Sequence, residues 1–185
     1  MLLTQIPNLL TLVRVAACPI LVLLLHERSY ELALYVFIAA GVTDGLDGYI
    51  AKKFDCVTSF GAVLDPIADK LLIGSAYIML AILGDIPFWL LVVVMFRDLV
   101  IIVGYLILVV MGHDVPMRPT YLSKINTFMQ ISLMGAVLVE KAGFLEISAL
   151  VTILIAGVLM TTVVSGVQYA WYWGIKQEFN GQPGK

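Results

Sequence analysis

Long runs of apolar residues limit which folds this chain can adopt more than any other feature of its sequence. A run of roughly 18 or more apolar residues can cross the hydrocarbon core of a bilayer as a helix. Only 13% of the 185 residues are charged, against about a quarter in a soluble domain. That is too little polar surface to cover a water-soluble globule, so the sequence predicts an integral membrane protein.

The spans should be helices, because lipid offers the backbone no hydrogen-bond partners and a barrel would show short strands of alternating polarity. We therefore expect an all-α bundle of six transmembrane helices, forming a single domain over residues 1–185. The polar tail from about Lys176 is expected to be frayed. The predicted spans cover about residues 8–26, 31–53, 60–83, 87–111, 123–141 and 146–173.

The basic residues of the short loops predict the orientation, since cytoplasmic loops carry an excess of Lys and Arg. With the N-terminus inside, the outer side holds only Arg28 and Lys141. The cytoplasmic side then holds six basic residues: Lys52, Lys53, Arg118, Lys124, Lys176 and Lys185. Both termini are therefore predicted to be cytoplasmic.

Two bulk properties exclude other classes of function. The net charge of −2 argues against a nucleic-acid-binding protein, which needs a basic face. The two cysteines, Cys18 and Cys56, have no metal-binding spacing, so zinc chemistry is not expected.

Four aspartates lie within the second and third predicted spans, where a charged side chain costs at least ~2.5 kcal/mol and is kept mainly for function. Asp44 and Asp47 are three residues apart in the second span, and Asp65 and Asp69 are four apart in the third. Each pair therefore shares a helix face, and the two antiparallel spans place the pairs at similar depth. Cations must neutralise such a cluster, and hard ions such as Mg²⁺, Mn²⁺ or Ca²⁺ suit all-oxygen ligands. We expect two ions, Mg²⁺ or Mn²⁺, as in two-metal phosphoryl-transfer sites.

Glycines accompany these aspartates, at Gly41, Gly45 and Gly48 in the second span and at Gly61 in the third. Glycine lets a ligand or another backbone approach closely. Two explanations of these glycines are open: they leave room for a bulky anionic ligand, or they allow close helix packing.

Residues 44–69 closely resemble the signature of the CDP-alcohol phosphatidyltransferases, D-x2-D-G-x2-A-R-x8-G-x3-D-x3-D. The four aspartates, Gly48, Gly61 and Ala51 stand at the stated spacing. One position differs from the signature: Lys52 stands where the signature has arginine. Lysine keeps the charge but lacks the bidentate fork that arginine offers to phosphate.

The resemblance implies a metal-dependent transferase of phospholipid biosynthesis. Such enzymes move a phosphatidyl group from CDP-diacylglycerol to the hydroxyl of an alcohol and release CMP. It further implies a homodimer in the bacterial inner (cytoplasmic) membrane, with the active site facing the cytoplasm. By the same resemblance Asp69 is the general base. The metal ligands would be Asp44, Asp47, Asp65 and Asp69, and the CDP-lipid would contact Asp44, Gly48, Lys52 and Gly61.

Three basic residues are candidates for binding a phosphate on the acceptor: Arg97 in the fourth span, and Arg118 and Lys124 around the loop before the fifth. The competing interpretations are ordinary loop charge for Arg118 and Lys124 and an internal ion pair for Arg97. Asp98, its neighbour in sequence, is expected to point away from Arg97, because adjacent helical residues do not face each other.

Two branches of the family compete for the identity of the acceptor. The opening Pro7-Asn8-Leu-Leu-Thr11-x-x-Arg14 resembles that of bacterial phosphatidylglycerophosphate synthases, whose acceptor is glycerol 3-phosphate. Cardiolipin synthases, which use phosphatidylglycerol, share this opening and the segment 64–70. The run Ser123-Lys-Ile-Asn126-Thr127 looks more like the cardiolipin branch. We expect glycerol 3-phosphate, with phosphatidylglycerol as the alternative.

Proteins of other classes also place aspartates in membrane helices. A small cation or proton carrier is the remote alternative, although such carriers usually show broken helices and internal repeats, which this sequence lacks. A membrane scaffold would have no need for buried acids.

Overall fold

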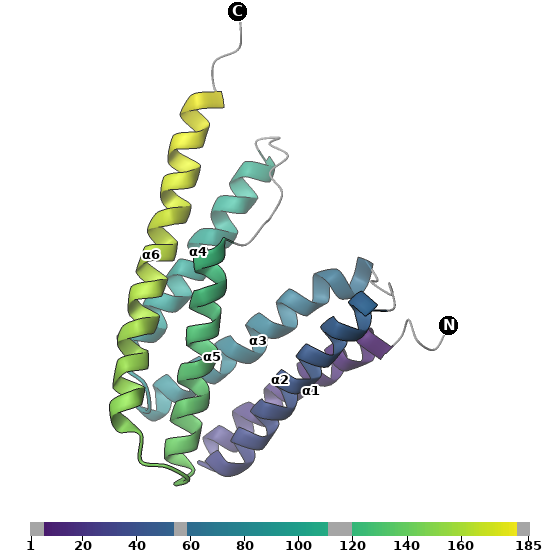
Figure 1. Ribbon diagram of the computed structural model, residues 1–185, viewed down its shortest axis with the longest axis vertical. Helices are drawn as coiled ribbons and strands as arrows, with labels where there is room; N and C mark the ends of the chain where they lie inside the picture. Colours follow the sequence, from purple (N-terminus) through teal and green to yellow (C-terminus); the bar gives the residue numbers. More distant parts are fainter. Residues whose placement is uncertain (1–5, 54–58, 111–119, 181–185) are drawn as a thin grey trace, which may run out of the picture. The chain divides into compact units, whose positions relative to one another are not determined.

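The computed structural model describes residues 6–53, 59–110 and 120–180, and within these ranges it contains helices and no strands (Figure 1). All but one of the predicted span ends fall within two residues of the observed helix ends. The prediction of an all-α protein is therefore confirmed. The helices are α1 (Ile6–His26), α2 (Tyr30–Lys53), α3 (Ser59–Leu83), α4 (Phe88–Val110), α5 (Tyr121–Lys141) and α6 (Ser148–Asn180).

The exception is the C-terminal end of α6, which continues to Asn180. The prediction of a frayed tail from Lys176 is therefore wrong. Lys176, Gln177 and Glu178 all have high helix propensity, and the first glycine after them is Gly181. A polar segment of this kind can continue a helix beyond its apolar part.

Three helices in the described part of the chain are long and apolar enough to cross a membrane: Phe88–Ile107, Tyr121–Lys141 and Ser148–Tyr169. Val13–His26 in α1 is a shorter apolar stretch. The helices α2 and α3 carry the aspartates and Lys70. Six spans and two cytoplasmic termini remain predictions.

Side-chain exposure along α4 supports a lipid environment. Val92, Phe96, Leu99, Val103 and Leu106 recur every three or four residues, and each is more than two-fifths exposed. A continuous apolar face of this kind is unfavourable in water and favourable against lipid. Several polar side chains are buried instead: Arg14, Arg97, Asn126, Gln130, Thr162 and Ser165.

The chain divides into two compact units. The first combines residues Met1–Ile86 with Met134–Ser148, and the second combines Pro87–Leu133 with Ala149–Lys185. The helix α5 therefore contributes its beginning to the second unit and its end to the first. A single domain over residues 1–185 stays a prediction.

In the first unit, α1 packs against both α2 and α3. The contacts bury Leu21 and Leu25 of α1 together with small residues such as Ala33, Ala68 and Ala76, which let the helices approach closely. Figure 1 shows the start of α1, the end of α2 and the start of α3 at one end of this unit. The three helices are therefore close to one another at this end.

Glycines end the helices at the opposite end of this unit. Gly84 follows α3 with φ 80° and Gly143 follows α5 with φ 77°, a conformation that residues with a side chain rarely adopt. Beyond them, Asp85 N–H donates to the Leu80 carbonyl at 2.9 Å and Phe144 N–H to the Val139 carbonyl at 3.2 Å. These bonds satisfy helix carbonyls that would otherwise lack partners.

Candidate active site

A buried arginine of α1 joins two of the signature aspartates. Arg14 Nη2 lies 2.8 Å from Oδ1 of Asp44 on α2, and Nη1 donates to Oδ1 of Asp69 on α3 at 2.9 Å. The Arg14 side chain is 1% exposed, whereas those of Asp44 and Asp69 are 47% and 41% exposed. The guanidinium therefore lies beneath the two carboxylates, which keep much of their surface accessible.

The helix lengths explain why these three residues meet. Arg14 lies eight residues after Ile6 at the start of α1, and Asp44 lies nine before Lys53 at the end of α2. Asp69 lies ten residues after Ser59 at the start of α3. At a rise of about 1.5 Å per residue, all three are about 12 to 15 Å from the same end of the unit.

The other predicted ligands are only partly described. Asp47 and Gly48 belong to α2, as does Lys52, and Asp65 and Gly61 belong to α3, but their side chains lie outside the described residues. Among the residues that the structure does describe, no three His, Cys, Asp or Glu side chains gather closely enough to hold a metal ion. The four-aspartate cluster therefore stays a prediction, of which the structure brings together Asp44 and Asp69.

Two of the predicted glycines face open space. A Cβ added at Gly41 or Gly45 would meet no atom within 4 Å in the described part of the chain. Packing against a described helix therefore does not explain why these two positions are glycine, and α2 offers an open surface next to Asp44.

In the second unit, Arg97 is the centre of a polar network. Its Nη1 donates to Oδ1 of Asp98 at 2.8 Å, and its Nη2 donates to the hydroxyls of Ser123 on α5 and Ser165 on α6 at 2.8 and 2.6 Å. The guanidinium also lies 5.9 Å from the ring centre of Tyr169. Arg97 is 6% exposed, so it holds α4, α5 and α6 together.

The expectation that Asp98 points away from Arg97 is wrong, because the two side chains form an ion pair. Adjacent residues do point in different directions on a helix, but the long arginine side chain can bend back across that angle. The structure confirms an internal ion pair for Arg97, with a partner on its own helix.

Two residues of the Ser123–Thr127 run, Ser123 and Asn126, also bond to the interior of the second unit. Ser123 accepts from Arg97, and Asn126 Oδ1 accepts from the hydroxyls of Thr161 and Thr162 on α6 at 2.9 and 2.8 Å. Asn126 is fully buried. Lys124 is exposed on the first turn of α5, and Arg118 lies outside the described residues.

A comparison with protein-family models decides the family of this chain. The model described as CDP-alcohol phosphatidyltransferase matches residues 4–165, which is most of the sequence. The chain belongs to the CDP-alcohol phosphatidyltransferase family.

Relatives of this transferase fall into the two branches that the sequence indicates. A probable phosphatidylglycerophosphate synthase of Mycobacterium tuberculosis is 35% identical over 171 residues, covering 89% of this chain and 79% of the relative. A CDP-diacylglycerol–glycerol-3-phosphate 3-phosphatidyltransferase of Rickettsia bellii is 33% identical over 172 residues, covering 89% and 93%. A CMP-forming cardiolipin synthase of Rattus norvegicus is 33% identical over 183 residues, covering 90% and 61%.

These comparisons confirm the predicted family and the predicted class of enzyme, a phosphatidyltransferase of phospholipid synthesis. Enzymes of this family generally depend on a divalent metal. The carboxylate oxygens of Asp44 and Asp69 are suitable ligands for such an ion. Asp44 and Asp69 are 47% and 41% exposed, and accessible carboxylate oxygens suit hard cations.

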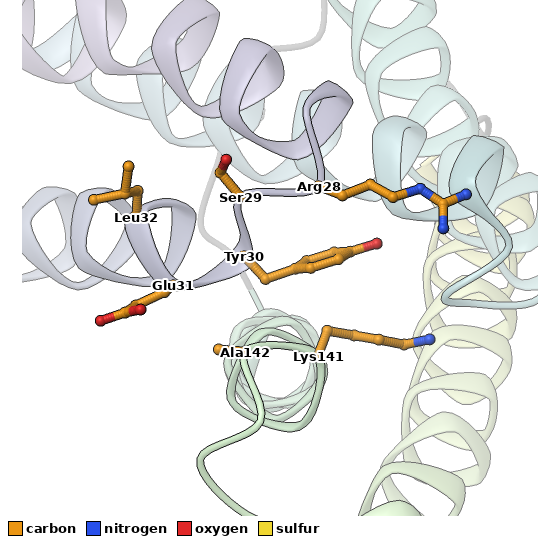
Figure 2. Close-up of a pocket in the computed structure, with 7 residues that line it drawn as sticks. All are labelled: Arg28, Ser29, Tyr30, Glu31, Leu32, Lys141 and Ala142. Carbon is orange, nitrogen blue, oxygen red and sulfur yellow. The ribbon is translucent and has the colours of Figure 1, made fainter.

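A separate pocket of about 330 Å³ lies at the other end of the first unit. In Figure 2 the side chains of Arg28, Tyr30 and Lys141 extend in the same direction. Tyr30 donates to Asp85 at 2.7 Å, and Lys141 lies 2.8 Å from the other oxygen of that carboxylate. Burial and then the Asp85 carboxylate raise the pKa of Tyr30 to about 12, so its hydroxyl keeps the proton that it donates. These bonds tie α2 and α5 to the turn after α3, which is a structural role.

Sequence reasoning missed the part that Arg14 plays. It placed Arg14 in the first predicted span and in the opening that both branches share, but it assigned Arg14 no partner. The signal was the similar depth of Arg14, Asp44 and Asp69 in their predicted spans. A cation inside a span needs an anion at the same depth. The periodicity of α1 alone does not say which helix face meets the aspartates.

Proposed function

We propose that this transferase moves the phosphatidyl group of CDP-diacylglycerol to glycerol 3-phosphate and so acts as a phosphatidylglycerophosphate synthase. The observation that carries the proposal is the meeting of Asp44 and Asp69, two signature residues from different helices, on one buried arginine. The choice of acceptor is supported by the relatives from Mycobacterium tuberculosis and Rickettsia bellii, which match this chain over most of their own length.

In the proposed reaction, the hydroxyl oxygen of glycerol 3-phosphate attacks the phosphorus that carries the diacylglycerol group. A new phosphorus–oxygen bond forms, the pyrophosphate bond breaks, and CMP leaves with the electron pair. Asp69 accepts the proton of the attacking hydroxyl, and its 41% exposure leaves it accessible to a substrate. Phosphoryl transfer of this kind depends mainly on positioning and on neutralising charge.

Two Mg²⁺ or Mn²⁺ ions, when bound to Asp44, Asp47, Asp65 and Asp69, would supply that neutralisation at the pyrophosphate. The cytidine diphosphate would lie along Asp44, Gly48, Lys52 and Gly61. The open surface of α2 beside Gly41 and Gly45 supports this placement, because a bulky ligand needs such room.

The three basic residues proposed to bind the acceptor are not equally well supported in that role. Lys124 is exposed and keeps its place as a phosphate-binding candidate together with Arg118. Both terminal nitrogens of Arg97 bond to groups of its own unit. We therefore propose that Arg97 acts mainly by holding the helices that carry the acceptor-binding residues.

A cardiolipin synthase is the second candidate, supported by the Ser123–Thr127 run and by the rat and human relatives at 33% and 32% identity. This chain spans 61% of the length of those two relatives. Ser123 and Asn126 are bonded inside the second unit, so helix packing accounts for them without an acceptor.

We further propose that the enzyme is a homodimer in a bacterial cytoplasmic membrane, with six spans, two cytoplasmic termini and its active site facing the cytoplasm. The exposed apolar face of α4 supports the membrane location. The excess of basic residues in the predicted inner loops supports the orientation.

An acceptor screen tests the proposal. Purified enzyme receives CDP-diacylglycerol and Mn²⁺, and CMP release is followed separately with glycerol 3-phosphate and with phosphatidylglycerol. We expect release with glycerol 3-phosphate, and none after the metal is removed with a chelator. Release with phosphatidylglycerol alone would identify a cardiolipin synthase, and metal transport in vesicles without any lipid turnover would favour the carrier alternative.

A further inference from the structure

Arg14 has no role in the family signature, yet it is the residue that connects the two described signature aspartates. It belongs to α1, the helix that packs against both α2 and α3. Its two terminal nitrogens bind one carboxylate each, so a single side chain sets the separation between Asp44 and Asp69. A displacement of Arg14 would move both carboxylates relative to each other.

A purely structural ion pair is a poor explanation for this arrangement. Burying charged groups is expensive, and a well-packed apolar residue of similar volume often stabilises a protein as well or better. Nearly half of each aspartate side chain is also accessible, so both carboxylates can bind a further ligand.

The three side chains differ in burial, so the cluster has a buried side and an accessible side. Arg14 is on the inner side and the carboxylates are on the accessible side, which is the geometry of an outer-shell partner behind metal ligands. Such partners orient the ligands, and their loss typically weakens metal binding about 10- to 100-fold.

We propose that Arg14 is a positioning residue that holds Asp44 and Asp69 in the geometry that binds the divalent metal. This inference rests on the proposed function of the four aspartates as metal ligands. It requires the fork of the guanidinium, because two separate N–H groups reach two carboxylates at once. The ammonium of lysine is a single point charge and cannot span them in the same way.

The test measures Mn²⁺ binding by the purified enzyme without lipid substrates, through the electron paramagnetic resonance signal of free Mn²⁺. The variants are Arg14→Lys, which keeps the charge, and Arg14→Gln, which removes it. Arg28→Lys is the matched control, since Arg28 lies in the same unit, is exposed and is remote from the aspartates. We expect both Arg14 variants to need about 10- to 100-fold more Mn²⁺ for half-saturation and the control to bind like the wild type.

Three results would overturn the proposal. Unchanged Mn²⁺ affinity in Arg14→Lys would mean that only the charge matters. Tighter binding in either variant would mean that Arg14 competes with the metal for the carboxylates. Loss of the folded state in both variants, seen by size-exclusion chromatography and thermal unfolding, would make Arg14 a structural residue.

The readout also separates this proposal from the function of the enzyme. Mn²⁺ binding needs no acceptor, so a wrong choice of acceptor leaves the result intact. If the wild type binds no Mn²⁺ at all, the metal role of the aspartates fails first. At saturating Mn²⁺, Arg14→Lys should recover more CMP release than it shows at low Mn²⁺, which a general loss of stability would not produce.

Discussion

Asp69 has three functions in the proposed site, because it binds Arg14, would bind a metal ion and is also the candidate base. One oxygen accepts the arginine N–H at 2.9 Å, while the side chain remains 41% exposed. An amide at this position can still accept that hydrogen bond through its oxygen. It cannot take the proton of an attacking hydroxyl, so this mutation separates the bond to Arg14 from the role of base.

Asp69→Asn should therefore keep CDP-diacylglycerol binding and reduce CMP release by about 10²- to 10⁴-fold, the usual contribution of a general base. Equilibrium binding of the lipid and the rate of CMP release provide the two measurements. Asp85→Asn is the matched control, because Asp85 is a buried aspartate at the other end of the same unit. Substantial turnover by Asp69→Asn would remove Asp69 from the role of base.

At the level of helices, α5 and α6 are joined by hydrogen bonds that the apolar pattern does not reveal. Asn126 is fully buried and accepts from two adjacent threonines of α6. In lipid, small and polar residues of this kind hold helices together, because apolar side chains gain little by leaving the bilayer. Asn126, which belongs to the run that resembles the cardiolipin branch, is thus used for packing.

Thr162→Val should destabilise the protein without changing its acceptor. Thr162 is buried and donates to Asn126 at 2.8 Å, and interhelical bonds of this type contribute about 0.6 to 1.7 kcal/mol. Thermal unfolding in detergent measures the loss, and the acceptor screen measures the ratio of the two activities. Thr127→Val is the control, since that hydroxyl bonds only within its own helix, to the Ser123 carbonyl. A changed acceptor ratio in Thr162→Val alone would show that the run does select the acceptor.

For the whole molecule, the exposed apolar side chains predict a lipid environment, and the loop charges predict the orientation of the protein in it. The exposed stripe of α4 and the three long apolar helices in the described part of the chain indicate a lipid environment. The orientation depends on a separate property, the excess of lysine and arginine on one side of the predicted spans.

A reporter that fluoresces only in the cytoplasm should therefore be active when fused after Lys185. Alkaline phosphatase, which folds only outside the cytoplasm, should be active when fused after Arg28 in the first predicted outer loop. Fluorescence and phosphatase activity in intact cells measure the two outcomes. The reverse pattern would place both termini and the signature aspartates on the outer side.

Much of this protein can be predicted from sequence because the relevant signals are local along the chain. The length of an apolar run predicts a span wherever the rest of the molecule lies, and all but one of the helix ends were predicted within two residues. The spacing of Asp44, Asp47, Asp65 and Asp69 likewise needs no tertiary contact to be recognised. The resemblance of that spacing to the family signature indicates the family and the class of reaction.

The partners of Arg14 and Arg97 could not be predicted in this way. Periodicity gives the faces of one helix, but it does not give the rotation of that helix against its neighbours or the rotamer of a long side chain. Arg14 meets Asp44 and Asp69 because α1 packs between α2 and α3, and Arg97 bends back to its own neighbour Asp98. Ion pairs in a low dielectric form wherever the packed helices bring opposite charges to the same depth, so packing selects the partners.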